Sequence, residues 1–212
     1  MSEMRAVFLE VAAAARPLVA ARAVAEHWNG ASSLPEFSVR GLAGHLVRCV
    51  VIVPRYLDAD PSPEGEPIAP LSYYDRAILS SDINSDDHVS VRTRGEELAS
   101  EGHGALVALL DAGLIEARTK LASAPPDRLV RVVRDLVLPL DDYLATRIVE
   151  IVVHADDLAH SVGLSAPELP DAAVATTIRY LVDLARLRHG DMAVVRALTR
   201  RERDEAEALR VF

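Results

Sequence analysis

Cysteine is almost missing from this chain, since Cys49 is the only one among its 212 residues. A single cysteine excludes an internal disulfide and any zinc site that is built from several cysteines. The lack of disulfides fits a reducing compartment, so we expect a cytoplasmic protein.

Aromatic residues and lysine are scarce as well. Phenylalanine, tryptophan and tyrosine together make up 4% of the chain, and Lys120 is the single lysine among 23 basic residues. Alanine is abundant by contrast, and this composition favours helices over strands.

Long apolar runs are also missing, which argues against a membrane-spanning helix. The longest uninterrupted run, 105–110, is far shorter than the roughly 20 residues that a bilayer requires. Glu3 and Glu10 interrupt the N-terminal segment, which lacks the basic start and clean apolar stretch of a targeting signal. We therefore expect a soluble protein with no membrane partner.

Basic residues are fewer than acidic ones: the chain has 23 Lys and Arg and 32 Asp and Glu, which gives a net charge of −9. Nucleic-acid binding requires basic side chains against phosphates, so we expect no nucleic-acid partner. Half of the residues are hydrophobic and the mean hydropathy is +0.14, enough for a sizeable core. Neither an internal repeat nor a linker-like stretch divides the chain, and we expect a single domain over 1–212.

Apolar spacing, proline and glycine predict a series of helices separated by loops. We expect Pro17 to break or kink a first helix, Ser38 to cap a later one, and Asp86 or Asp87 to cap a long one. A proline-rich loop is expected at 61–70 and a brief extended piece at 129–133. The expected helices cover 5–15, 18–28, 39–57, 73–79, 86–122, 140–162, 171–188 and 192–209. These elements predict an all-α bundle.

The most unusual segment is the apolar helix expected at 140–162. At about 100° per residue, Arg147, Glu150, His154 and Asp157 fall within a stripe roughly 80° wide, with isoleucine and valine between them. A helix that is apolar over most of its circumference is buried, so its polar stripe needs partners inside the protein.

Three kinds of partner remain open for this stripe. Glu150 and His154 could pair on a surface stripe, as residues four apart on a helix do. Alternatively, Arg147 could pair with Glu150 or Asp157 in a buried network. The third alternative is a divalent metal ion bound by Glu150 and His154, with a third ligand from another helix.

His45 is the candidate for that third ligand, because it lies among Leu42, Leu46 and Cys49 on the inward face of its own helix. A lone histidine there is more often a satisfied core residue. Two inward polar sites on separate helices favour a shared metal, because each otherwise needs its own buried partner. His45, Glu150 and His154 would leave coordination positions open for water or substrate, as catalytic zinc sites do.

The remaining histidines and the cysteine carry less weight. Solvated positions are expected for the histidines at helix ends or beside glycine and acidic residues, and His160 lies about 120° around the helix from His154, off the polar stripe. These end positions belong to His27, His88, His103 and His189. Cys49 is expected to be a buried, inert thiol, since no base is evident beside it.

Two segments resemble a known family. After Trp28, the stretch 32–46 (SSLPEFSVRGLAGHL) resembles the early signature of the mycothiol-dependent maleylpyruvate isomerase family. The stretch 138–158 (LPLDDYLATRIVEIVVHADDL) is similar to its second signature, and 188–203 (RHGDMAVVRALTRRER) is similar to a closing segment of such proteins. The wider group is the DinB-like superfamily of four-helix bundles.

The resemblance implies an all-α, DinB-like four-helix bundle with additional short C-terminal helices. It also implies that His45, Glu150 and His154 bind a divalent metal, zinc above all, and that mycothiol is the thiol co-substrate. The isomerase itself carries a further C-terminal domain, which we do not expect here, so the particular isomerisation stays open. Arg147 is expected to orient a substrate. Asp157 is expected to hold a metal-binding side chain in place without binding the metal itself.

Together these features predict a metal- and mycothiol-dependent isomerase or thiol S-transferase that acts on a small electrophile. A non-catalytic metal-binding or regulatory bundle is the alternative, with its acidic surface and last helix serving protein partners. Under the first hypothesis, the partners are a small-molecule substrate and a low-molecular-weight thiol. A homodimer is kept as an open oligomeric state.

Overall fold

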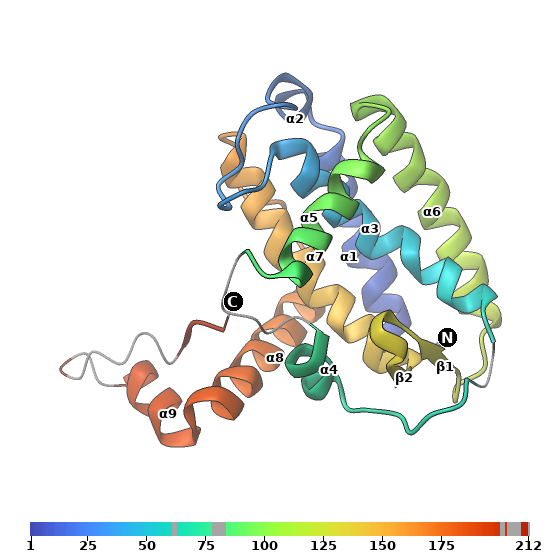
Figure 1. The fold of residues 1–212 in the computed structure, drawn as a ribbon, viewed down its shortest axis with the longest axis vertical. Coiled ribbons are helices and arrows are strands. Elements are labelled where there is room, and N and C mark those ends of the chain that lie inside the picture. The colour runs from blue at the N-terminus through green and yellow to red at the C-terminus, as the bar shows by residue number, and fades with distance from the viewer. Residues whose placement is uncertain (61–62, 78–83, 200–201, 203–208, 212) are drawn as a thin grey trace.

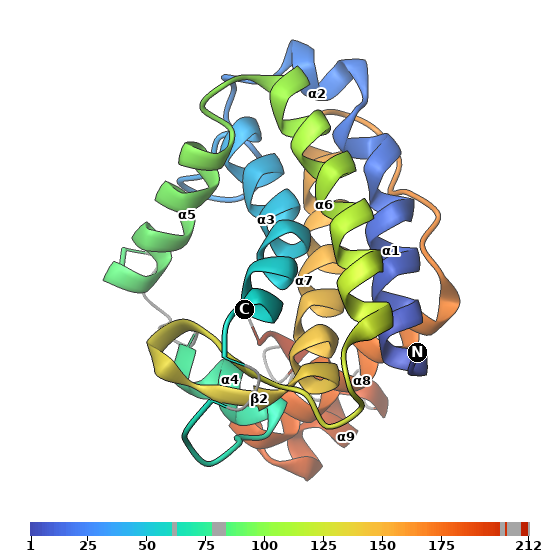
Figure 2. The same ribbon diagram turned by 90° about the vertical axis from the view of Figure 1, so that its right-hand side faces the viewer.

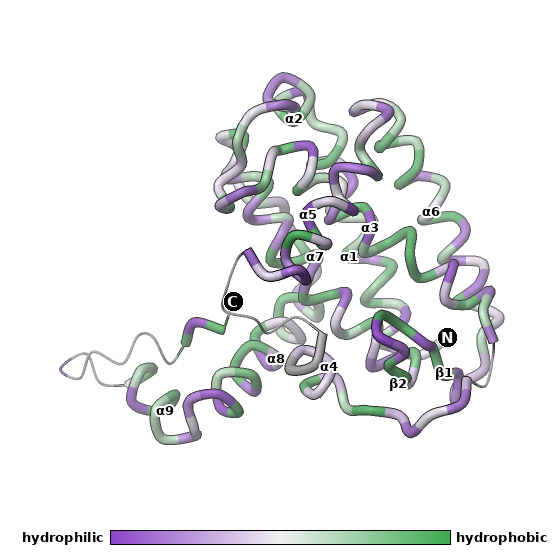
Figure 3. Tube along the Cα trace, in the orientation of Figure 1, coloured by the Kyte–Doolittle hydropathy of each residue, from purple (hydrophilic) through white to green (hydrophobic). Residues whose placement is uncertain are grey.

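Four long helices lie side by side and bury most of the core: α1 (Glu3–Val19), α3 (Val39–Asp58), α6 (His103–Ser123) and α7 (Leu140–Ser161) (Figures 1 and 2). In the computed structural model, which describes residues 1–60, 63–77, 84–199, 202 and 209–211, α1 and α3 each pack against both α6 and α7. Hydrophobic residues run along these helices in Figure 3. The expected all-α, DinB-like bundle is confirmed.

The remaining elements lie around the bundle. They are α2 (Arg22–Glu26), α4 (Pro70–Ala77), α5 (Asp86–Leu98), β1 (Leu129–Arg131), a 3₁₀ turn (Val133–Asp135), β2 (Val137–Pro139), α8 (Asp171–His189) and α9 (Asp191–Thr199). The extended piece expected at 129–133 pairs as β1 with β2 in an antiparallel hairpin. Helix α5 packs on α3, next to the bundle, while α8 packs on α7 and α9 on α8 (Figure 2). A single domain over 1–212 stays a prediction.

Several helix ends follow the local sequence. The side chain of Ser38 accepts a hydrogen bond from the backbone N–H of Gly41 and so caps α3, as expected. Gly163, just after α7, and Gly190, at the end of α8, have φ angles of +70° and +82°, which glycine adopts without strain. The C-terminal helices are present, but α8 has 19 residues and is not short.

Two expected boundaries near the ends of the chain need correction. Pro17 does not break the first helix, because α1 continues through it to Val19. A proline near the C-terminal end costs one backbone hydrogen bond and leaves the rest of the helix intact. The helix expected at 18–28 is reduced to α2. Of the helices expected at 73–79 and 192–209, residues 78–79, 200–201 and 203–208 lie outside the described part.

The long helix expected at 86–122 is also wrong. It is two helices, α5 and α6, that meet at an angle of 98°. Gly102 adopts a φ of +95° between them, a conformation that side chains disfavour. The cap is Ser85, which accepts a hydrogen bond from the N–H of His88, and neither Asp86 nor Asp87 takes that position.

Among the described residues, no single helix has the length and apolarity to cross a membrane. The bent pair of α5 and α6 passes that test of length and composition only when the two helices are taken together.

Helices α3 and α5 cross with their backbones in direct contact. A Cβ atom added to Gly44 would overlap the carbonyl oxygen of Gly95, and one added to Gly95 would overlap the carbonyl oxygen of Gly41. Only glycine permits so close an approach. The crossing therefore sets the position of α5 over α3.

Replacing Gly44 by alanine should lower the free energy of unfolding by about 1–3 kcal/mol, because the new methyl group forces the two backbones apart. Gly104→Ala is the matched control, since nothing lies within 4 Å of a Cβ atom there and alanine is the better helix former. Urea unfolding of both variants tests this expectation. A Gly44→Ala protein as stable as the parent would contradict the crossing described above.

Candidate functional site

The polar stripe of α7 is buried. Arg147 and Glu150 are each 8% exposed, and His154 and Asp157 are partly covered. A stripe on the protein surface is therefore the wrong interpretation. The stripe needs partners inside the protein, and α3 and α4 supply them.

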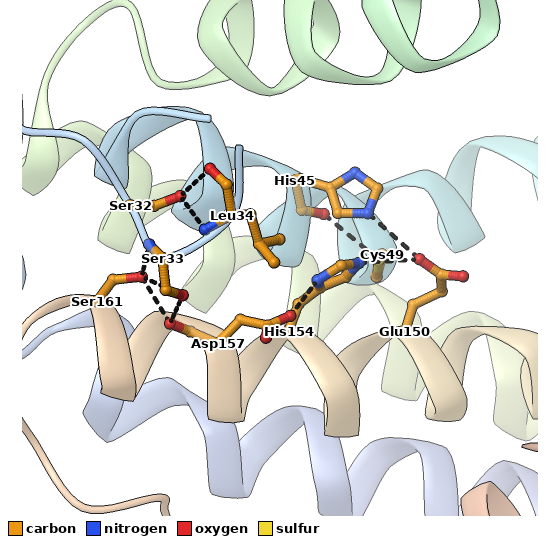
Figure 4. Close-up of polar contacts among 9 residues, drawn as sticks. All are labelled: Ser32, Ser33, Leu34, His45, Cys49, Glu150, His154, Asp157 and Ser161. Carbon is orange, nitrogen blue, oxygen red and sulfur yellow. Dashed lines mark hydrogen bonds and ion pairs between the residues drawn. The ribbon is translucent and has the colours of Figure 1, made fainter. Parts of the chain in front are cut away.

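His45, Glu150 and His154 meet at one carboxylate oxygen (Figure 4). Nε2 of His45, on α3, lies 3.3 Å from Oε2 of Glu150, and Nε2 of His154 lies 3.4 Å from the same atom. The two imidazole rings are 4.8 Å apart and nearly perpendicular. The structure thus brings together the three residues that the sequence singled out, and we call them the His–Glu–His cluster.

Asp157 orients one of these rings. Its carboxylate accepts a hydrogen bond from Nδ1 of His154 at 3.0 Å, which directs Nε2 of that ring towards Glu150. His45 has no equivalent support, because its Nδ1 is buried without a hydrogen-bond partner among the described residues. Both rings therefore contact Glu150 through Nε2, but only His154 has a second carboxylate at its Nδ1.

Burial and hydrogen bonding act in opposite directions on these groups. Burial alone would raise the pKa of Glu150, but hydrogen bonds from His154 and His45 hold that pKa well below its usual value. Burial alone would lower the pKa of His154, but its hydrogen bonds to Asp157 and Glu150 raise it to about 9. Burial lowers the pKa of His45. The carboxylate of Glu150 thus lies between one ring with a raised pKa and one ring with a lowered pKa.

Arg147 lies among aromatic side chains and makes no ion pair within the described residues. The alternative in which it pairs with Glu150 or Asp157 is therefore not the one found. Its guanidinium carbon lies 5.0 Å from the centre of the Tyr143 ring and 5.8 Å from that of Tyr73, within the range of cation–π attraction. It also donates a hydrogen bond of 3.4 Å to the Tyr73 hydroxyl. Sequence reasoning missed both tyrosines, although Tyr143 precedes Arg147 by four residues on the same helix.

Cys49 lies one helical turn after His45, and its sulfur, a nitrogen of His45 and an oxygen of Glu150 all lie within 4.8 Å of one another. The thiol donates to the carbonyl oxygen of His45 at 3.4 Å. Burial raises its pKa to about 12, so it remains protonated at neutral pH. The expectation of a buried thiol is confirmed, and its inertness stays a prediction.

The other histidines lie away from the cluster. His27 and His189 are exposed, as expected, and His160, which lies off the polar stripe, is exposed too. His88 and His103 are partly exposed, and so less solvated than expected. His103 contacts the carbonyl oxygen of Val19, whereas His88 faces the cavity described next.

A cavity of about 540 Å³ opens beside the cluster, between α3, α5 and α7. Its wall contains the cluster, Arg147, both tyrosines and a set of further residues from α3, α5, α7, the 3₁₀ turn and the loop at 34–37. These further residues are Leu34, Pro35, Phe37, Arg48, Cys49, Ile52, Tyr56, Asp87, His88, Val91, Arg92, Arg94, Val133, Val149, Val153 and Asp157. Sequence reasoning missed the α5 residues, because it extended that helix away from the site.

Ser33 attaches the loop over the cavity to α7. Its backbone N–H donates to the hydroxyl of Ser161 at 2.9 Å, and its hydroxyl donates to the carbonyl oxygen of Asp157 at 3.1 Å (Figure 4). Phe37, further along the loop, packs edge to face against His45 with ring centres 6.2 Å apart. The loop thus covers His45, the ring whose Nδ1 has no hydrogen-bond partner among the described residues.

A helical bundle that carries a His–Glu–His cluster at the wall of a cavity defines the class of this protein. The model of the mycothiol maleylpyruvate isomerase N-terminal domain family matches residues 8–159. The chain belongs to this family, which confirms the resemblance seen in its two signature segments.

The chain is also similar to a solved structure, the crystal structure of the mycothiol-dependent maleylpyruvate isomerase. The TM-score is 0.52 at 14% sequence identity, and the match covers 87% of this chain and 72% of that chain. At this identity the likeness shows the fold alone. No curated protein matches the chain.

Cys49 should not react with Ellman's reagent in the native protein, because its thiol is 1% exposed and remains protonated. One thiol per chain should react after denaturation in guanidinium chloride. Absorbance at 412 nm before and after denaturation measures both states. If the native protein rapidly released one equivalent of the coloured product, Cys49 would be accessible. It would then be a candidate nucleophile.

Proposed function

We propose that the chain is a metal-dependent enzyme that uses a low-molecular-weight thiol, mycothiol, to act on a small electrophile. The observation that carries this proposal is the meeting of two imidazoles and one carboxylate at a single point of the cavity wall. The mycothiol in the names of the family and of the similar isomerase structure supports the choice of thiol.

The donor set fits a divalent ion. Two histidine nitrogens and one glutamate oxygen are a ligand set that zinc accepts in catalytic sites, with further positions left for water or substrate. The contact of Asp157 with Nδ1 of His154 supports this fit, since metal-binding histidines commonly donate their other N–H to a carboxylate. We therefore assign His45, Glu150 and His154 as ligands and zinc as the ion.

Cys49 is left out of the ligand set, although its sulfur lies near the cluster. A thiol must lose its proton to bind a metal, and burial opposes that loss here. His154 takes its place, because Nε2 of that ring faces the same oxygen of Glu150.

A divalent ion in this cluster would lower the pKa of a thiol beside it, as it does for water. The side chains of the protein would supply the other functions, namely orienting the ligands, binding the substrate and excluding water. Asp157 holds the ring of His154 in one orientation. Arg147, which Tyr73 and Tyr143 hold in place, offers a buried cation that orients an anionic part of the substrate. The loop at 34–37 and Ile52 exclude water from one side of the cavity.

Two reaction classes suit a thiol that is activated in this way. Reversible addition of the thiolate to an activated alkene isomerises the double bond, because the adduct rotates before the thiolate leaves. Displacement of a leaving group transfers the substrate to sulfur. A reducing compartment suits either reaction, and we propose the cytoplasm as the location.

Protein purified without a metal-affinity step should contain about one divalent ion per chain, and His154→Ala should lose most of it. His160→Ala is the matched control, since His160 lies on the same helix but is exposed and outside the cluster. Elemental analysis by mass spectrometry measures both variants. Unchanged metal content in His154→Ala would rule out the ligand set proposed here.

Turnover should require both the metal and the thiol. Incubation with mycothiol and a panel of activated alkenes and alkyl halides should give products at a rate well above that of the thiol alone. A chelator should abolish this excess rate, and added zinc should restore it. If a protein that carries its metal turned over none of these electrophiles, the alternative of a non-catalytic metal-binding bundle would be favoured.

A further inference from the structure

Two arginines, Arg48 on α3 and Arg94 on α5, line the same cavity as the His–Glu–His cluster. The glycine crossing brings them together, because Arg48 follows Gly44 by one helical turn and Arg94 directly precedes Gly95. Burial lowers the pKa of Arg94, and the positive charge of Arg48 lowers it further. Two like charges thus lie near each other in a partly buried wall.

Neither arginine has a carboxylate partner among the described residues. The acidic groups of the cavity are already engaged: Glu150 and Asp157 contact histidines, and Asp87 pairs with Arg134 from the 3₁₀ turn. The α5 side of the cavity therefore carries an excess of positive charge, although the chain as a whole has a net charge of −9.

Arg94 is incompletely satisfied. One of its terminal nitrogens donates to the hydroxyl of Ser90 at 2.7 Å. Its Nε is buried and has no hydrogen-bond partner among the described residues. A buried donor without a partner costs free energy, and a guanidinium recognises a carboxylate through two parallel N–H groups. The free donor and the neighbouring charge of Arg48 together match a carboxylate.

We propose that Arg48 and Arg94 form a carboxylate-binding subsite that holds an acidic group of the electrophilic substrate. This proposal rests on the function proposed above and narrows its substrate class to electrophiles that carry a carboxylate. Tyr56 and Ile52 lie on the wall of the same cavity. The substrate would be anchored by its carboxylate at the arginines, with its reactive carbon directed towards the cluster.

Isothermal titration calorimetry with succinate tests the subsite without any reaction. The full-length protein, as purified, should bind succinate, and its neutral analogue succinamide should bind far more weakly. Arg48→Gln and Arg94→Gln should each weaken succinate binding at least about tenfold, because each removes a charge-assisted contact. Arg118→Gln is the matched control, since Arg118 is exposed on α6 and should leave the affinity unchanged.

His154→Ala separates this proposal from the metal site. Succinate should still bind to that variant within about twofold of the parent, because the arginines are intact. Loss of binding in His154→Ala with full binding in both arginine variants would place the carboxylate at the cluster and overturn the subsite. Absence of succinate binding to the parent, or equal binding of succinamide, would overturn it as well.

A folding control accompanies the arginine variants. Each should keep the parent thermal unfolding midpoint or raise it, because it removes repulsion between two like charges.

Arg94→Lys keeps the charge but loses the paired N–H groups, so it should bind succinate more tightly than Arg94→Gln and more weakly than the parent. If Arg94→Lys bound no better than Arg94→Gln in a folded protein, the charge argument would fail.

Discussion

The buried carboxylate of Glu150 is the constraint on which the rest of the site depends. A charge removed from water costs several kcal/mol unless hydrogen bonds or opposite charges replace its hydration. Helix α7 is apolar around Glu150 and cannot leave this side chain in solvent. Two histidines take the place of water, one from the next turn of α7 and one from α3. The need to satisfy one acid thus determines which face of α3 turns towards α7.

The cavity beside this cluster has an uneven distribution of charge. Each acidic side chain of its wall contacts a histidine or an arginine. Arg147, by contrast, is held by aromatic rings. Arg48 and Arg94 have no acidic partner among the described residues. Aromatic rings stabilise a buried cation without neutralising it. The pocket of an acidic protein therefore presents net positive charge, and this arrangement favours an anionic small molecule over a neutral one.

The cluster could be predicted from sequence because its members obey helical spacing. Glu150 and His154 are one turn apart on an apolar helix, and His45 lies on the inward face of another. The opposite wall could not be predicted in this way. Its position depends on the 98° bend near Gly102 and on the contact between Gly44 and Gly95, and the second of these joins segments distant in sequence. Local periodicity favoured one straight helix there, and tertiary packing prevailed over it.

The burial and protonation of Cys49 decide whether this residue can supply a reactive thiolate. Cys49 is close enough to the cluster to be considered, but burial raises its pKa to about 12 and its proton is held against the carbonyl oxygen of His45. A thiolate is the reactive form of sulfur, and this residue is a thiol at neutral pH. Within the described chain, thiol chemistry at the cluster therefore requires sulfur from outside the protein. A cavity of about 540 Å³ is within the size range of pockets that hold small molecules, so it has room for one.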